Sequence, residues 1–248
     1  MEKINDRLDL VLNAEAQIAE GPFWDQQNQL LYWIDILGKS INIYNPVAEN
    51  KSIQLDKLIG AVIPTTEEGK LLAALEDGIY LIDAETSEKK FLVNPDSNDF
   101  KRRFNDGKCD ALGRFWVGTM DLEENNSIGS LYCLDQQLNL TEKVEGIKVS
   151  NGLSWSLDNE IMYYIDSPTE KVSAFDYDLE TGEISNRRTI ISFNEEKGVP
   201  DGMTIDSQGM LWIAHFGGSQ VSRWNPETGE KIEKVEIPSE KVTSCAFG

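Results

Sequence analysis

The sequence has little of what builds a nitrogen- or sulfur-bound metal site, because its 248 residues include one histidine and three cysteines. Cys109, Cys133 and Cys245 are far apart and lack a CxxC spacing, which excludes a site rich in Cys and His ligands. Scattered cysteines in odd number are typical of proteins that stay in a reducing compartment. We therefore predict three buried thiols and a cytoplasmic protein.

Basic residues are also scarce. Lys and Arg number 23 against 43 for Asp and Glu, which gives a formal net charge of −20. An acidic surface repels phosphate groups, so we expect neither nucleic acid nor an anionic membrane as a partner. The sequence leaves any protein partner unidentified. The chain has no apolar run that resembles a signal peptide or a membrane span.

A helical apolar stripe is missing too, since no stretch of ten or more residues repeats its hydrophobic positions every 3.6 residues. Short strand-like runs alternate instead with Gly, Asn, Asp and Pro, as in residues 78–83, 129–134 and 171–177. This pattern is typical of an all-β protein that is built from hairpins.

One segment of this pattern recurs along the chain. Asp201 precedes a short strand, with a turn at Asp206 to Gly209 and a second strand after it; Asn105 stands in the same relation to Asp110 and Gly113. We call the equivalent positions slots, and their spacings lie between 41 and 50 residues. The six slots are Glu20, Ala61, Asn105, Asn151, Asp201 and Ser244.

Repeats of about 45 residues with three or four short strands each are the signature of a β-propeller. We predict a single six-bladed propeller domain over residues 1–248, with at least five complete four-stranded blades. Few residues follow Ser244, so we expect the last blade to be truncated at the C-terminus. The run from Arg7 to Leu12 precedes the first slot and is expected to be a strand without a blade of its own.

The first strand of each propeller blade lines the central channel, so the slots should converge on one axis. Four of them would gather two carboxylates and two amides at one end of the channel: Glu20, Asn105, Asn151 and Asp201. Their oxygen atoms suit a hard divalent cation such as calcium or magnesium, and zinc can also use carboxylates. The plainer alternative is that Asn-Gly and Asp-Gly pairs serve only as turn residues.

Several motifs carry a family resemblance over nearly the whole chain. The chain resembles the senescence-marker-protein/regucalcin/gluconolactonase/luciferin-regenerating-enzyme family in seven segments, which occur in order at residues 20–25, 103–108, 117–120, 150–155, 163–167, 200–206 and 243–248. The resemblance implies a six-bladed propeller with one divalent cation, whether calcium, zinc, magnesium or manganese.

The resemblance also implies roles for individual residues. Three residues would hold the metal, namely Glu20, Asn151 and Asp201, and Asp201 would also be the catalytic acid/base. Substrate contacts would come from Arg103, Asn105 and, as a looser match in the loop after the third motif, Glu123.

The function that these features favour is a metal-dependent lactonase of the gluconolactonase type, which opens sugar-type lactones as its small-molecule substrates. The cation would polarise the lactone carbonyl, and Asp201 would act as the base. An alternative from another class is a calcium-binding regulatory protein of the regucalcin type without essential catalysis. A third alternative, a scaffold that binds proteins, is disfavoured by the polar residues predicted at the channel.

Overall fold

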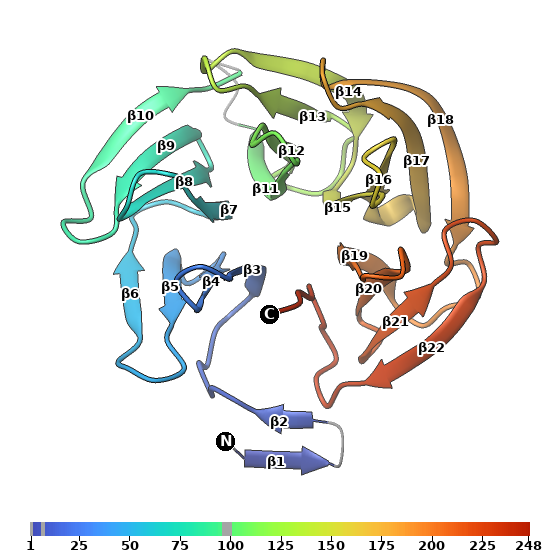
Figure 1. The fold of residues 1–248 in the computed structure, drawn as a ribbon, viewed down its shortest axis with the longest axis horizontal. Coiled ribbons are helices and arrows are strands. Elements are labelled where there is room, and N and C mark those ends of the chain that lie inside the picture. Colours follow the sequence, from blue (N-terminus) through green and yellow to red (C-terminus); the bar gives the residue numbers. More distant parts are fainter. Residues whose placement is uncertain (1, 6–7, 96–100) are drawn as a thin grey trace.

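The computed structural model describes residues 2–5, 8–95 and 101–248, and it shows an all-β propeller (Figure 1). Five antiparallel sheets of four strands each surround a central axis. In every sheet the strands follow one another in sequence order from the axis outward, so each sheet is one blade. The predictions of an all-β propeller and of at least five complete blades are therefore confirmed.

The blades are numbered in chain order, and each is defined by its four strands. Blade 1 contains β3 (Ala19–Asp25), β4 (Leu30–Asp35), β5 (Ser40–Tyr44) and β6 (Lys51–Gln54). Blade 2 contains β7 (Ile59–Pro64), β8 (Lys70–Leu75), β9 (Gly78–Asp83) and β10 (Lys89–Val93). Blade 3 contains β11 (Arg102–Cys109), β12 (Phe115–Asp121), β13 (Gly129–Leu134) and β14 (Leu140–Ile147).

Blade 4 contains β15 (Ser150–Trp155), β16 (Ile161–Asp166), β17 (Lys171–Asp178) and β18 (Glu183–Ser192). Blade 5 contains β19 (Val199–Ile205), β20 (Leu211–Phe216), β21 (Gln220–Trp224) and β22 (Lys231–Glu236). The one helical element among the described residues is η1, a 3-10 turn at Ser167–Thr169. No helix in this part of the chain is long and apolar enough to cross a membrane.

The hairpin turns follow the sequence closely. In blade 5 the N–H of Gly209 donates to the carbonyl of Asp206 (2.9 Å), and Gly209 has a φ of +80°, which favours glycine. The Asp206 side chain accepts hydrogen bonds from the N–H groups of Gln208 (2.9 Å) and Met210 (3.0 Å). This carboxylate therefore closes the turn that the Asp-Ser-Gln-Gly segment predicts.

The sixth predicted unit differs from the other five. Within the described residues, the segment that contains Ser244 has no hairpin of its own, so the prediction of six blades is wrong and five are present. The N–H of Gly202 still donates to the carbonyl of Thr243 (2.7 Å), which places this segment beside β19. The pair β1 (Glu2–Asn5) and β2 (Leu8–Leu10) forms a separate two-stranded sheet (Figure 1). The strand predicted over Arg7 to Leu12 corresponds in part to β2, and Arg7 itself lies outside the described residues.

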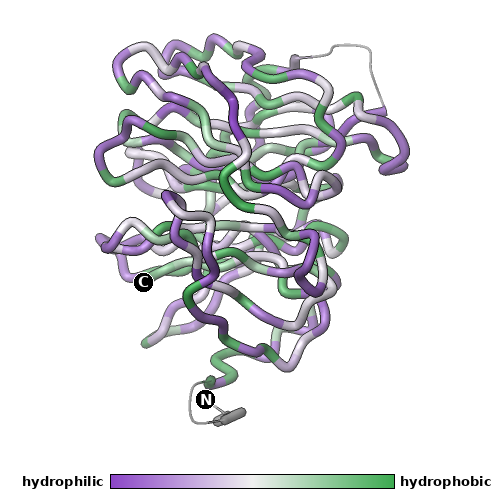
Figure 2. Tube along the Cα trace, turned by 90° about the vertical axis from the view of Figure 1, so that its right-hand side faces the viewer, coloured by the Kyte–Doolittle hydropathy of each residue, from purple (hydrophilic) through white to green (hydrophobic). Residues whose placement is uncertain are grey.

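Hydrophobic side chains fill the spaces between neighbouring blades. Ile34 and Ile41 of blade 1 belong to one buried cluster with Leu75 of blade 2, and Ile165 of blade 4 to another with Ile213 of blade 5. Polar residues are concentrated in many of the outer turns (Figure 2). All three cysteines are free, as predicted; Cys133 is buried, whereas Cys109 and Cys245 are half-buried.

Every inner strand is irregular at or beside its slot. The pairing register of the inner strand against its neighbour shifts in all five blades: between Glu20 and Phe23, Ile59 and Ala61, Phe104 and Gly107, Asn151 and Leu153, and Pro200 and Met203. Such bulges bend a strand and change the direction of its side chains. The sequence did not predict them, and they decide which residues face the channel.

Candidate functional site

Four of the six slots meet at one cavity of about 250 Å³ near the axis. Five of the six predicted site residues line it, namely Glu20, Arg103, Asn105, Asn151 and Asp201. The four slot side chains among them are only 6–8% exposed. Residues that span 181 positions of sequence are thus brought together because each lies near the start of an inner strand.

Glycines allow the inner strands to approach one another here. A Cβ atom on Gly152 would lie 2.6 Å from the carbonyl oxygen of Asp201, and one on Gly202 would lie 2.1 Å from Oγ of Ser244. Any larger residue would push the neighbouring strand away. The Asn-Gly and Asp-Gly pairs therefore bring blades 4 and 5 and the C-terminal segment close enough to form one cavity.

A chain of hydrogen bonds fixes the two slot amides. Nη1 of Arg103 donates to Oδ1 of Asn105 (2.7 Å), and Nδ2 of Asn105 donates to Oδ1 of Asn151 (2.8 Å). Nδ2 of Asn151 donates in turn to Oγ of Ser167 (2.8 Å), whose hydroxyl donates to the carbonyl of Pro200 (2.6 Å). The chain runs from blade 3 across blade 4 to blade 5, and it sets the orientation of both amides.

The two slot carboxylates have far fewer partners. Glu20 accepts a hydrogen bond from the N–H of Gly21 (2.5 Å), and Asp201 accepts one from the N–H of Gly202. Burial raises the pKa of Glu20 to about 8, with a further contribution from the charge of Asp106. Burial also raises the pKa of Asp201 well above its ordinary value, and the charges of Glu20 and Asp106 add to the effect.

Asp106 is a third buried carboxyl close to Glu20 and Asp201, and sequence reasoning missed it. It follows the slot residue Asn105 and is 8% exposed, and burial raises its pKa. A signal for it exists in the sequence, because the residue after the slot is glycine at positions 21, 152 and 202 but aspartate here. Nearby, Nζ of Lys108 crosses to the carbonyl of Met203 (2.7 Å), and burial lowers the pKa of this lysine.

The donor set at the cavity fits a divalent cation. Glu20 and Asp201 offer carboxylate oxygens that have few donors of their own, and Oδ1 of Asn151 keeps a second lone pair. Within the described ranges no three His, Cys, Asp or Glu side chains are grouped so that they could hold a metal ion together. A cation here would therefore need the amide oxygen of Asn151 beside the two carboxylates.

The loop after β12 brings a glutamate to the cavity, and it is Glu124. Asp121 accepts hydrogen bonds from the N–H groups of Glu123 (3.2 Å) and Asn126 (2.9 Å), and Glu124 adopts a φ of +57° within the turn. Glu123 is not among the residues that line the cavity. Burial lowers the pKa of Arg103, while the charges of Glu124 and Glu20 act in the opposite direction.

Comparisons with known proteins find relatives over nearly the whole chain. A family model described as the SMP-30/Gluconolactonase/LRE-like region matches residues 18–248. The "Putative sugar lactone lactonase YvrE" of Bacillus subtilis is 38% identical over 97% of this chain and 83% of its own, and regucalcin of Danio rerio is 35% identical over 98% and 82%. The solved structure of a luciferin-regenerating enzyme superposes with a TM-score of 0.91 at 35% identity, covering 94% of this chain and 80% of that one.

Proposed function

The chain belongs to the SMP-30/gluconolactonase/LRE-like family, and from this membership we propose that it is a divalent-metal-dependent lactonase. One observation supports the proposal above all others. Two carboxylates with raised pKa values, Glu20 and Asp201, are buried at the same small cavity as an arginine. Ionisable groups with shifted pKa values that line a cavity are typical of catalytic sites.

Glu20, Asn151 and Asp201 are the residues that would hold the cation, which is calcium, zinc, magnesium or manganese in this proposal. A divalent cation, when bound, polarises a lactone carbonyl and stabilises the negative charge that develops on its oxygen. The hydrogen bond from Asn105 keeps Oδ1 of Asn151 in a fixed orientation at the cavity (2.8 Å). The amide ligand therefore needs little rearrangement to bind.

Asp201 supplies the acid/base function in this proposal. Its carboxylate takes a proton from water as the water oxygen bonds to the lactone carbonyl carbon. When the bond between that carbon and the ring oxygen breaks, the same carboxyl returns the proton to the ring oxygen, which gives a hydroxy acid. Burial supports this role, because a carboxyl with a raised pKa holds a proton more readily near neutral pH.

Arg103 and Asn105 form one substrate-binding unit. Nη1 of Arg103 is held by the carbonyl of Phe104 (3.0 Å) and by Oδ1 of Asn105 (2.7 Å), so the guanidinium is fixed at the cavity wall. Its other N–H groups are donors for the oxygens of a lactone. Glu124 lines the same cavity and offers an acceptor for a substrate hydroxyl, the role for which Glu123 was the sequence-based prediction.

The proposal is tested by measuring hydrolysis of a panel of lactones. The panel starts with D-glucono-δ-lactone, and each assay is run with a chelator and then with calcium, zinc, magnesium or manganese. We expect hydrolysis that is lost with the chelator and restored by at least one cation. Cation binding without hydrolysis of any lactone would overturn the proposal and favour a regucalcin-type calcium-binding role.

A further inference from the structure

We propose that the preferred substrate is a lactone whose ring carries an apolar substituent, an inference that rests on the proposed lactonase function. The inference rests on the lining of the cavity, which is largely apolar beyond the polar slot residues. Six hydrophobic side chains line the cavity together with the catalytic and metal-binding candidates: Ile18, Ile36, Met120, Val149, Val199 and Phe216.

Three of these side chains occupy one repeated position, two residues before a slot. Ile18, Val149 and Val199 precede Glu20, Asn151 and Asp201 in this way, and all three line the cavity. Val199 and Asp201 both belong to β19, where residues two apart point to the same face. The three hydrophobic residues stand at or before the first residue of the inner strand, and therefore nearer the face where these strands begin. We call them the apolar collar.

Arg103 holds the equivalent position in blade 3 and also lines the cavity, so one cation stands beside the apolar collar. The other three hydrophobic side chains come from the ends of second strands. Ile36 follows β4, while Met120 and Phe216 lie at the ends of β12 and β20. Blades 1, 3, 4 and 5 therefore contribute the hydrophobic part of the cavity wall, which Arg103 and Glu124 interrupt.

The uncharged polar groups of the lining are largely engaged already. Both hydrogens of the Asn105 amide are donated, to Ser150 O and to Asn151 Oδ1 (2.8 Å each). The hydroxyl of Ser167 donates to a backbone carbonyl (2.6 Å), as does that of Thr243, which reaches Ala19 O (2.6 Å). The groups that remain for substrate hydroxyls are therefore the charged ones, such as Arg103 and Glu124, and the rest of the wall is hydrocarbon.

This distribution separates two classes of lactone. A ring with several hydroxyls would bury some of them against hydrocarbon without partners, which weakens binding. An alkyl substituent would instead gain roughly fourfold in affinity for each methylene that is buried. The cavity volume of about 250 Å³ lies below the usual range for drug-sized ligands, so the substituent is a short chain.

The first experiment compares kcat/KM for three δ-lactones with the metal-loaded protein: δ-valerolactone, its butyl-substituted homologue δ-nonalactone, and D-glucono-δ-lactone. We expect the butyl lactone to exceed each of the others by at least about tenfold. A gluconolactone value equal to or above that of the butyl lactone would overturn the inference and leave the lactonase proposal intact. If none of the three is hydrolysed with any cation, both fail.

A second measurement does not depend on turnover. Calorimetry on the metal-free protein compares 2-piperidone with 6-butyl-2-piperidone, which are lactams of the same ring size that the site should not hydrolyse. Tighter binding of the butyl compound by at least about tenfold supports an apolar wall. Equal binding of the two lactams would contradict it, whatever the state of the metal site.

Matched variants then test which residues form the apolar part of the cavity wall. Val149→Thr and Val199→Thr keep the side-chain shape but add a hydroxyl, and each should lower the ratio of butyl to unsubstituted kcat/KM by about fivefold or more. Val242→Thr is the control, since Val242 precedes Ser244 at the same repeat position but does not line the cavity. Its ratio should stay at the wild-type value. A ratio that falls equally in all three variants, or in none, would overturn the assignment of the collar.

Discussion

Carboxylates at the two ends of the same inner strands have opposite environments. On β19, Asp201 lies at the cavity and Asp206 lies five residues later, where the strand turns. On β11 the slot residue is the amide Asn105, and Asp110 again stands five residues later at the turn. Asp206 accepts hydrogen bonds from Trp212 Nε1 (3.0 Å) and Arg223 Nε (2.7 Å). Asp201, by contrast, accepts its hydrogen bond from one backbone N–H.

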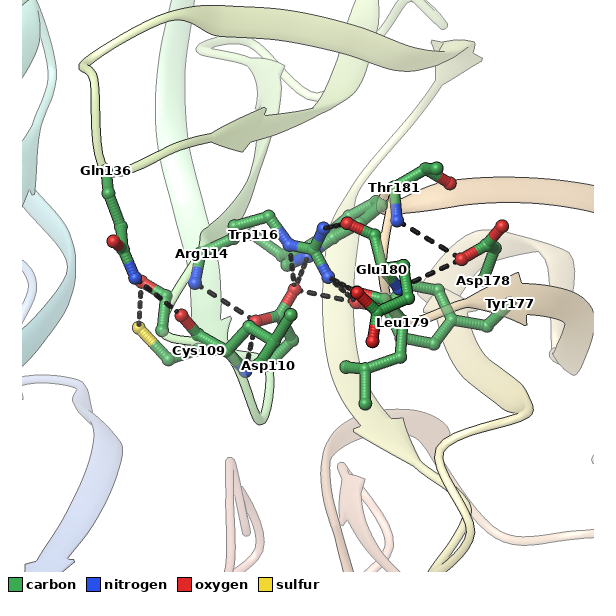
Figure 3. A network of polar contacts seen from close by, with 12 residues as sticks. Cys109, Asp110, Arg114, Trp116, Gln136, Tyr177, Asp178, Leu179, Glu180 and Thr181 are labelled. Atoms are coloured by element: carbon green, nitrogen blue, oxygen red, sulfur yellow. Dashed lines mark hydrogen bonds and ion pairs between the residues drawn. The ribbon is translucent and has the colours of Figure 1, made fainter.

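The turn end of blade 3 shows how completely such a carboxylate can be satisfied (Figure 3). Asp110 accepts from Arg114 Nε (2.6 Å), Trp116 Nε1 (3.0 Å) and the Tyr177 hydroxyl (2.6 Å). Arg114 also reaches the carbonyl of Leu179, which ties blade 3 to the β17–β18 turn of blade 4. Although burial acts to raise it, these hydrogen bonds hold the pKa of Asp110 below its ordinary value.

The contrast separates carboxylates that the fold itself satisfies from those whose oxygens it leaves available. At the turn ends, donors from side chains and backbone keep Asp110 and Asp206 charged, so the charge contributes to folding. At the cavity, Glu20 and Asp201 are buried without such donors, which costs stability and leaves their oxygens available. Sites that are destabilised in this way are common where function requires them.

The largest effect that this comparison predicts is on activity at the cavity end. Asp201→Asn keeps one oxygen but removes the charge and the base, so lactone hydrolysis at saturating metal should fall by at least about 100-fold. The unfolding free energy of this variant should stay equal or rise, because a neutral amide replaces a buried carboxyl that has few hydrogen-bond donors. Steady-state kinetics and denaturant unfolding provide the two readouts. Near-full turnover would show that Asp201 is not the base.

A substitution at the turn end of blade 3 should instead lower stability and leave activity unchanged. Asp110→Asn leaves the guanidinium of Arg114 buried without its counter-ion, since the two side chains are 0% and 10% exposed. Breaking such a pair typically costs about 3–5 kcal/mol of unfolding free energy, measured by urea titration. The kcat of the folded fraction should remain at the wild-type value. A loss below about 1 kcal/mol would refute the structural role of this network.

Glu20→Gln sharpens the comparison within the cavity itself. Removal of one anionic ligand should weaken cation affinity by about tenfold or more, because ligand charge sets the strength of an oxygen site. Excess metal should therefore restore part of the activity, unlike in Asp201→Asn. Calorimetric titration of the cation gives the affinity directly. Unchanged affinity would exclude Glu20 from the proposed ligand set.

The repeat in the sequence was sufficient to predict the propeller but not the number of blades. Turns such as Asp206 to Gly209 recur because one carboxylate and one glycine satisfy a hairpin locally, and local chemistry is readable from sequence. The error concerns the segment at Ser244. It copies the start of a repeat and does lie beside β19, but it lacks the hairpin that would make it a blade.

The site was predictable only where it follows the repeat. The slots gave Glu20, Asn105, Asn151 and Asp201 because equivalent positions of a propeller converge. Asp106, whose charge acts on Glu20 and Asp201, was missed because it lies in the bulge between Phe104 and Gly107, and pairing irregularities leave no periodic signal. Glu124 was missed because the turn that Asp121 closes decides which glutamate of this loop reaches the cavity, and the repeat spacing does not encode that turn.

The smallest predicted effect concerns pH at the turn end of blade 5. Burial acts to raise the pKa of Asp206, but hydrogen bonds from Arg223, Met210 N–H and Trp212 lower it from 3.8 to about 2. The resulting stabilisation is fully present above about pH 4 and is lost as the pH falls through about 2. Unfolding free energies of the wild type and Asp206→Asn should therefore differ at neutral pH and converge in this acid window. Because the amide cannot titrate, a constant difference down to about pH 2 would show that the charge of Asp206 contributes nothing.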